Sequence, residues 1–163
     1  MNIGAIRILG IDPGLGATGW GLIEVTGSRL AYVRCGSIRT DPATATAERL
    51  ALIHRGLVRL IEDERPNEGA VEETFVNRDP QSALKLGQAR GVALAALSLG
   101  GLRVAEYAAN LIKKTVVGVG HAEKQQVAMM VKMLLPASEA RTPDAADALA
   151  AAICHAQHRR GAG

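Results

Sequence analysis

The chain has 163 residues, of which 48% are hydrophobic and 21% are charged, so its composition excludes a disordered or fibrous protein. Its formal net charge of +3 permits a nucleic-acid partner but does not by itself predict one. Two cysteines, Cys35 and Cys154, without a CxxC spacing exclude a disulfide scaffold and a thiolate zinc site, so a reducing, cytoplasmic setting is expected.

The first forty residues have the pattern of an antiparallel meander of strands. A β-branched, apolar run over 6–11 predicts a buried strand that ends at the turn formed by Asp12, Pro13 and Gly14. Two further strands are predicted over 19–25 and 30–38. Asp12 is therefore expected at the C-terminal tip of a strand in the interior of the sheet.

From residue 46 onward the chain alternates between helices and strands. Apolar spacing predicts helices over 46–65, 81–99, 108–116 and 122–135, with strands over 70–74 and 102–106. Thr142 and Pro143 are typical of the N-cap and first residue of a last helix, which is expected to run to about His158.

These elements predict one α/β domain over 1–163. Its mixed five-stranded sheet is expected to begin with the antiparallel meander, to continue with parallel strands and to be flanked by helices. The ends, 1–5 and 159–163, are expected to be loose. The N-terminal sequence does not have the pattern of a secretory signal, and the apolar stretch over 92–99 is too short to cross a bilayer, so no membrane role is expected.

Four acidic residues occur where a bare carboxylate is energetically costly: Asp12, Glu72, Asp144 and Asp147. The first two belong to strands that helices should cover on both faces, and the last two share one face of an alanine-rich helix. Converging carboxylates repel each other unless a cation holds them, and oxygen ligands favour Mg²⁺ or Mn²⁺ over zinc. Two such ions can activate water for phosphodiester hydrolysis.

Each of these acids also has a structural interpretation. Asp12 is a common turn residue before Pro13, and the helix dipole favours Asp144 in a first turn. Glu72 and Glu73 point to opposite faces of one strand, and periodicity does not decide which of them joins a site. The residues by themselves therefore leave open whether the four acids meet.

Four segments resemble the RuvC family of crossover junction endodeoxyribonucleases over nearly the full chain. They are GIDPG at 10–14, VEETF at 71–75, SALKLGQARG at 82–91 and DAADAL at 144–149, with support from KKTVVGVGHAEK at 113–124. The ten-residue block is very specific, whereas GIDPG alone is weak.

The resemblance implies an RNase H-like fold and a structure-specific DNA endonuclease that acts in homologous recombination and DNA repair. It implies a homodimer that nicks two opposing strands of a Holliday junction symmetrically and leaves 5′-phosphate and 3′-hydroxyl ends. Mg²⁺ is the implied cofactor, with two ions per site and Mn²⁺ as a substitute, and RuvA and RuvB are the implied branch-migration partners.

The resemblance also implies roles for individual residues. The four acids become the catalytic metal ligands, and Glu72 is selected over Glu73. Phe75 is implied to stack on an unpaired base at the crossover, although its residue type alone equally suits the edge of the core. Further DNA contacts are expected from basic residues, with the first two at positions that the family uses near the scissile phosphate: Lys113, Lys124, Arg78, Lys85 and Arg90.

Three other functions stay open at this point: an RNase H-like nuclease for another branched DNA or for a hybrid, a phosphate-binding half of an actin-like ATPase, and a non-catalytic junction-binding module. The GxGxxG pattern at 14–19 does not predict a dinucleotide site, because a strand follows it where a helix is needed.

Several other residues receive structural interpretations. Gly87 and Gly91 predict close helix packing, and the dimer contact is one place for it. His155 and His158 suit a helix C-terminus better than a metal site, whereas Trp20 and His121 receive no role. The three methionines of the helix over 122–135 are expected to fill the core: Met129, Met130 and Met133.

Overall fold

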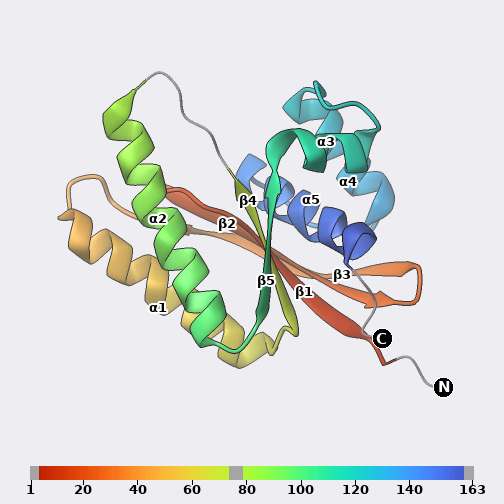
Figure 1. The fold of residues 1–163 in the computed structure, drawn as a ribbon, viewed down its shortest axis with the longest axis horizontal. Coiled ribbons are helices and arrows are strands. Elements are labelled where there is room, and N and C mark those ends of the chain that lie inside the picture. Colours follow the sequence, from red (N-terminus) through yellow and green to blue (C-terminus); the bar gives the residue numbers. More distant parts are fainter. Residues whose placement is uncertain (1–3, 74–78, 160–163) are drawn as a thin grey trace.

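A computed structural model describes residues 4–73 and 79–159 of the chain. Within these residues the chain forms strands and helices in the order β1 (Ile6–Asp12), β2 (Ala17–Thr26), β3 (Arg29–Arg39), α1 (Thr46–Glu64), β4 (Glu68–Glu73), α2 (Pro80–Leu99), β5 (Arg103–Ala108), α3 (Ala109–Val117), α4 (Lys124–Leu134) and α5 (Pro143–His158), shown in Figure 1.

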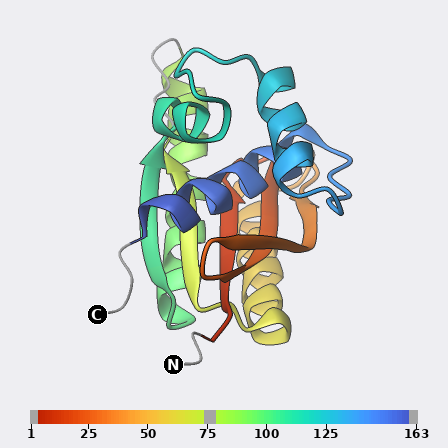
Figure 2. The same cartoon turned by 90° about the vertical axis from the view of Figure 1, so that its right-hand side faces the viewer.

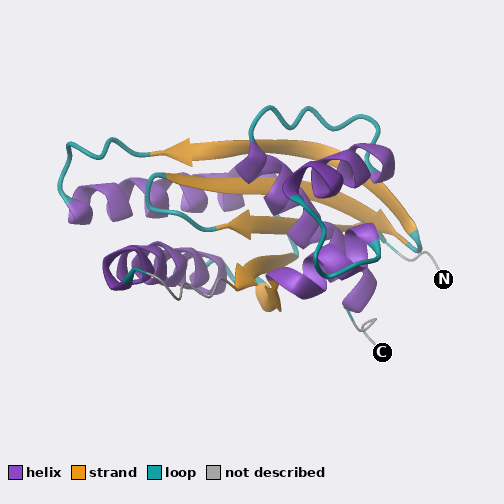
Figure 3. Cartoon of the chain, turned by 90° about the horizontal axis from the view of Figure 1, so that it is seen from above, coloured by secondary structure: helices purple, strands orange, loops and turns teal. Residues whose placement is uncertain are grey.

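The five strands form one mixed sheet in the order β3-β2-β1-β4-β5. β1 and β3 pair antiparallel with β2, whereas β1 pairs parallel with β4 and β4 pairs parallel with β5. Figure 3 distinguishes these strands from the helices that flank them. The predicted mixed sheet, an antiparallel meander followed by parallel strands, is confirmed.

Two layers of helices bury the two faces of the sheet. α1 and α2 cover one face, and α5, with α3 and α4 beside it, covers the other (Figures 1 and 2). Successive side chains of β1 enter different cores, because Ile8 packs with α5 and Leu9 packs with α1 and α2. Both side chains are fully buried, as the apolar run of β1 predicts.

Glycines in β1 and β2 let α5 approach the sheet unusually closely. A Cβ atom at Gly10 would collide with the carbonyl oxygen of Ala148, and one at Gly19 would collide with that of Asp144. α5 can pack this closely because its side chains here are small. Eight consecutive residues from Ala148 to His155 are buried, and four of them are alanines. This close packing carries the N-terminal turn of α5 to the end of β1.

Capping interactions explain where two helices begin. Thr142 Oγ1 accepts a hydrogen bond of 3.3 Å from the amide of Ala145, so the predicted N-cap of α5 is confirmed. α4 begins two residues later than expected, because Glu123 forms a capping box with Gln126, whose side chain accepts from the Glu123 amide at 2.9 Å.

The prediction for the methionines is wrong for two of the three. Met129 and Met133 are 64% and 66% exposed, and only Met130 packs against the core. The reason is the direction in which α4 faces α5. Val127 and Val131 form its buried stripe, and the exposed methionines lie on the other side of the helix.

Arg159 also departs from the expectation of a loose C-terminal end. Its guanidinium donates two hydrogen bonds to Glu68, of 3.0 and 2.7 Å, and its side chain is 14% exposed. The remaining end residues 1–3 and 160–163 lie outside the described part of the chain. Both cysteines are free, and no helix among the described residues is long and apolar enough to cross a bilayer.

Candidate functional site

The C-terminal ends of β1 and β4 bring two of the predicted acids together. The two strands are parallel neighbours in which Ile11 pairs with Val71, so the next residues, Asp12 and Glu72, lie side by side at one edge of the sheet. Parallel strands end in the same direction, and this geometry follows directly from their pairing. Glu73, the alternative that the sequence left open, faces the other side of β4.

The last helix brings the other two acids to the same edge. Gly19 pairs with Asp12 in the sheet, and the backbone of Asp144 lies directly against Gly19. Asp147 lies one turn further along α5 and faces a hollow of about 260 Å³ that Asp12 and Glu72 also line. Asp144 stays at the margin of this carboxylate hollow, where its Oδ2 accepts a 3.4 Å hydrogen bond from Ser37.

Burial and mutual repulsion perturb the acids of the carboxylate hollow. Burial, followed by the charges of Glu72, Asp147 and Asp144, raises the pKa of Asp12 from 3.8 to about 8. Burial and the charge of Asp147 raise the pKa of Glu72, and burial also raises the pKa of Asp147. The cluster therefore lacks the positive charge that would keep all of its carboxylates ionised at neutral pH.

Two lysines lie at the carboxylate hollow but do not neutralise it. Lys113 and Lys124 line the hollow, and Lys124 Nζ lies 3.9 Å from Asp147 Oδ2. The Lys124 side chain is 78% exposed, so water screens this ion pair strongly. The two lysines are therefore available to an anionic ligand.

The donor set suits a hard divalent cation. Carboxylate oxygens from β1, β4 and α5 face one hollow, and oxygen ligands of this kind select Mg²⁺ or Mn²⁺. In the described residues no group of three His, Cys, Asp or Glu side chains has the geometry of a formed metal site. A divalent cation bound in the hollow would offset the repulsion between these carboxylates.

The remaining predicted DNA contacts are placed differently from the two lysines. Phe75 and Arg78 lie outside the described residues. Lys85 is exposed in the second turn of α2. Arg90, in contrast, pairs with Glu106 and joins α2 to β5, with a side chain that is only 17% exposed. Arg90 therefore has an intramolecular partner, and its DNA contact stays a prediction.

A second buried acidic group, which the sequence interpretation missed, lies at the opposite end of β4. Glu68 accepts hydrogen bonds from Arg159 and from Nε2 of His155, the latter at 2.6 Å, and Tyr107 donates to Nδ1 of His155 at 2.7 Å. His158 Nε2 lies 2.9 Å from Thr115 Oγ1, within hydrogen-bonding distance. His155 and His158 therefore both have side-chain partners in the fold. In the sequence, the position of Glu68 four residues before Glu72 on the same strand was the one feature that could have indicated a second buried acid.

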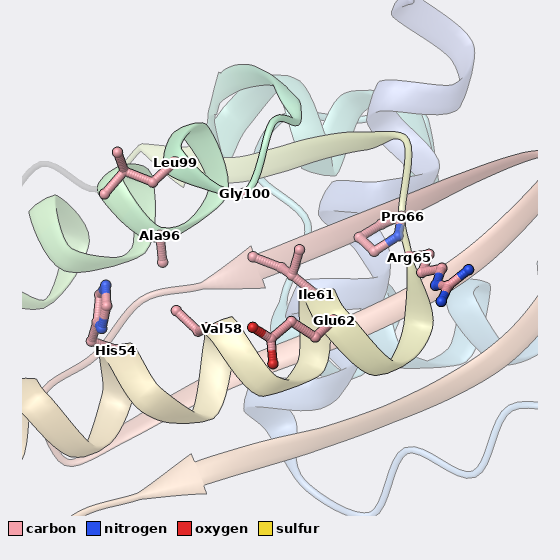
Figure 4. Close-up of a pocket in the computed structure, with 9 residues that line it drawn as sticks. All are labelled: His54, Val58, Ile61, Glu62, Arg65, Pro66, Ala96, Leu99 and Gly100. Carbon is pink, nitrogen blue, oxygen red and sulfur yellow. The ribbon is translucent and has the colours of Figure 1, made fainter.

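Another hollow of the described chain lies elsewhere. It measures about 650 Å³ and lies between α1 and α2, where His54 and Val58 face Ala96 and Leu99 (Figure 4). Glu62 is the one acid among its described lining residues. Because it lacks a group of converging acids, this hollow does not offer the chemistry of the carboxylate hollow.

Comparison with known proteins yields consistent matches. A family model described as crossover junction endodeoxyribonuclease RuvC matches residues 8–155. A relative of that description from Methylocella silvestris is 68% identical over 159 residues, which are 98% of this chain and 90% of the relative. A relative from Xanthobacter autotrophicus is 60% identical over 162 residues, 99% of this chain and 96% of the relative.

Solved structures match over similar lengths. Thermus thermophilus RuvC in complex with a Holliday junction substrate has a TM-score of 0.86 and 35% identity, with 93% of each chain covered. The yeast mitochondrial Holliday junction resolvase Ydc2 has a TM-score of 0.68 at 13% identity, with 93% of this chain and 79% of that chain covered. The second match supports the fold alone.

Proposed function

The chain belongs to the RuvC family of crossover junction endodeoxyribonucleases, and from this membership we propose that it resolves Holliday junctions at the carboxylate hollow. The observation that carries the assignment to this site is the convergence of Asp12, Glu72 and Asp147 on one hollow, with burial and repulsion raising the pKa of each. Isolated structural carboxylates would instead acquire cationic partners, as Glu68 does.

We assign the metal-binding role to Asp12, Glu72, Asp144 and Asp147. Mg²⁺ is the proposed ion, with Mn²⁺ able to replace it and two ions per site as the family resemblance implies. When bound, such ions lower the pKa of a water molecule and polarise the phosphate. Asp12 must lose its proton for this role, because a protonated carboxyl group is a poor ligand.

The two lysines act on the substrate side of the same reaction. Lys113 and Lys124 face the carboxylate hollow from α3 and α4, where each can pair with an oxygen of the scissile phosphate. Negative charge accumulates on that phosphate as water attacks, so a fixed ammonium group favours the transition state. Phe75, Arg78, Lys85 and Arg90 remain proposed DNA contacts.

A homodimer through α2 fits this function. The structure places no atom within 4 Å of a Cβ added at Gly87 or Gly91, so this side of α2 is open in the described chain. Leu84 and Leu99, near the two ends of the helix, are 65% and 83% exposed. A second copy packed there would relate two carboxylate hollows by a dyad, as symmetric nicking of a junction requires.

The remaining assignments belong to the same proposal. The order of the elements supports a single RNase H-like domain over 1–163, the two unpaired cysteines support a cytoplasmic location, and the family resemblance alone supports cooperation with RuvA and RuvB. We keep as the alternative a nuclease for another branched DNA or for an RNA–DNA hybrid, since metal-assisted hydrolysis acts on the phosphodiester group that these substrates share with a junction.

A cleavage assay in Mg²⁺ tests the proposed function. A synthetic four-way junction, a linear duplex and an RNA–DNA hybrid are incubated with wild type and with Asp12→Asn. We expect wild type to cut the junction alone, with symmetric nicks, and the variant to bind the junction without cutting it. Preferential cleavage of the hybrid would favour the alternative, and full activity of Asp12→Asn would refute the metal assignment.

A further inference from the structure

A second hollow adjoins the carboxylate hollow on the side of α4 and α5. It measures about 300 Å³, and it includes Lys124 and Asp147, which also line the carboxylate hollow. Its other lining residues come from α4, α5 and the segment between them: Gln125, Ala128, Ala140, Arg141, Thr142, Pro143 and Ala146. The shared side chains make the two hollows neighbours along one path across the surface.

Arg141 lies in this second hollow on a backbone that is held on both sides. Before it, Lys132 Nζ donates to the carbonyl oxygen of Ser138 at 2.7 Å, and Ala140 packs against the core. After it, Thr142 caps α5 through the amide of Ala145. The position of the arginine relative to α5, and hence to Asp147, is therefore set by the fold.

The guanidinium of Arg141 has no intramolecular partner among the described residues. The residue is exposed, and within residues 4–73 and 79–159 it makes neither an ion pair nor a side-chain hydrogen bond. Arg90 and Arg159 differ, because Arg90 is paired with Glu106 and Arg159 with the buried Glu68. Arg141 can therefore accept an external anion without losing an internal contact.

The lining of the second hollow matches a sugar–phosphate backbone. Arg141, Lys124 and Gln125 supply hydrogen-bond donors, and Asp147, shared with the carboxylate hollow, is the one acid among the described residues that line it. Alanines and a proline provide an apolar surface for a deoxyribose ring. Arginine pairs with a phosphate through two parallel hydrogen bonds, which holds the phosphate in one orientation.

We propose that the second hollow is a phosphate-binding subsite, with Arg141 as its main contact, for the DNA strand next to the scissile phosphate. This inference rests on the proposed function. The strand would pass from Lys113, across Lys124 and the carboxylates, to Arg141 on the far side of Lys124. A backbone contact fixes the register of the strand in the carboxylate hollow but carries no base specificity.

Binding at different salt concentrations tests the subsite. Wild type and Arg141→Gln are titrated with a four-way junction in EDTA, so that no strand is cut. We expect a several-fold weaker affinity for the variant and a salt dependence whose slope is smaller by about one for each protomer. Arg141→Lys should restore the slope, because it restores the charge. An unchanged slope for Arg141→Gln would overturn the proposal.

Arg55→Gln is the matched control. Arg55 is an exposed arginine of α1, which packs on the opposite face of the sheet, and the substitution removes the same charge. We expect this variant to keep the affinity and slope of wild type. If both variants weaken binding equally, the loss reflects overall charge and the subsite is refuted.

Single methylphosphonate substitutions locate the contact. Each phosphate near the cut is neutralised in turn, and binding and cleavage by wild type and Arg141→Gln are compared. We expect one position, adjacent to the scissile phosphate, at which neutralisation weakens wild type but not the variant. Equal sensitivity of both proteins at every position would overturn the subsite. If wild type cuts the junction in that case, the proposed function still holds, whereas a wild type that cuts no junction refutes both.

Discussion

Two glutamates of β4 lie in opposite electrostatic environments. Glu68 and Glu72 are four residues apart, so they face the same side of the sheet, and α5 lies over both. Hydrogen bonds from Arg159, assisted by His155, lower the pKa of Glu68 to about 2. Burial and the charge of Asp147 raise the pKa of Glu72.

The difference comes from the two ends of α5. Its C-terminal end supplies Arg159 and His155 to Glu68, whereas its N-terminal end supplies Asp144 and Asp147 to the neighbourhood of Glu72. One end of the helix therefore stabilises the fold and the other end destabilises it. The destabilised end is where a ligand of opposite charge can bind with a gain of free energy.

The pH dependence of stability has opposite signs at the two ends. Glu68 contributes stability above its unfolded pKa of 4.5, and this contribution is lost as pH falls toward 2. Asp12, with its pKa raised from 3.8 to about 8, reduces stability at and above pH 8, and this cost is relieved as pH falls toward 3.8. A fall in pH therefore removes the stabilising contribution of Glu68 and relieves the destabilising contribution of Asp12.

The largest expected effect is the loss of cleavage on removal of one carboxylate. Asp147→Asn should slow junction cleavage by at least about 100-fold, because the amide cannot hold a cation as the carboxylate does. The same change should raise the thermal midpoint without metal, since it removes repulsion. Single-turnover cleavage and thermal unfolding measure the two effects. A variant less stable than wild type would contradict the inference that repulsion between carboxylates destabilises this end of α5.

Glu68→Gln should have the opposite effect on stability. It leaves Arg159 and His155 without their carboxylate, which should lower the free energy of unfolding by about 3 kcal/mol at pH 7. The loss should shrink as pH is lowered from 5 to 2, as the wild-type Glu68 becomes protonated. Urea unfolding at several pH values measures it. Glu62→Gln, an exposed glutamate of α1, is the control and should change stability by less than about 0.5 kcal/mol.

Addition of a divalent cation should stabilise the protein through the carboxylate end of α5. At about 100 times its dissociation constant, Mg²⁺ should raise the free energy of unfolding by about 2.7 kcal/mol. Because Asp12 must deprotonate, binding should release protons and weaken below about pH 8. Calorimetric titration in buffers of different ionisation enthalpy measures the proton release. Equal stabilisation of wild type and Asp12→Asn would disprove the link to the carboxylate hollow.

The smallest expected change in stability belongs to the exposed ion pair. Lys124→Gln should alter the free energy of unfolding by less than about 1 kcal/mol, because the ammonium group lies 3.9 Å from Asp147 and is mostly in water. Its cleavage rate should still fall, since the proposed target of Lys124 is the phosphate. Lys124→Gln should therefore lose much activity for little stability, whereas a change in the Arg159–Glu68 pair should mainly lower stability. A loss of stability as large as that of Glu68→Gln would remove the distinction.

Much of the fold could be predicted because its signals are local. The apolar run before Asp12, the turns of the meander and the capping residue Thr142 all act within a few residues, and the structure confirms each. The exposure of Met129 and the two partners of Glu68 could not be predicted in this way. Both depend on which side of a helix faces a neighbour from a distant part of the chain.

Local patterns along the chain were enough to predict the strand and helix types, the placement of Asp12 at a strand tip and, through four segments taken together, membership of the family. The folded chain was needed to show which acids share a hollow and which pair with a cation. The physical reason is that a carboxylate's pKa depends on charges within a few ångströms, and close packing of α5 on Gly10 and Gly19 brings those charges together from opposite ends of the chain.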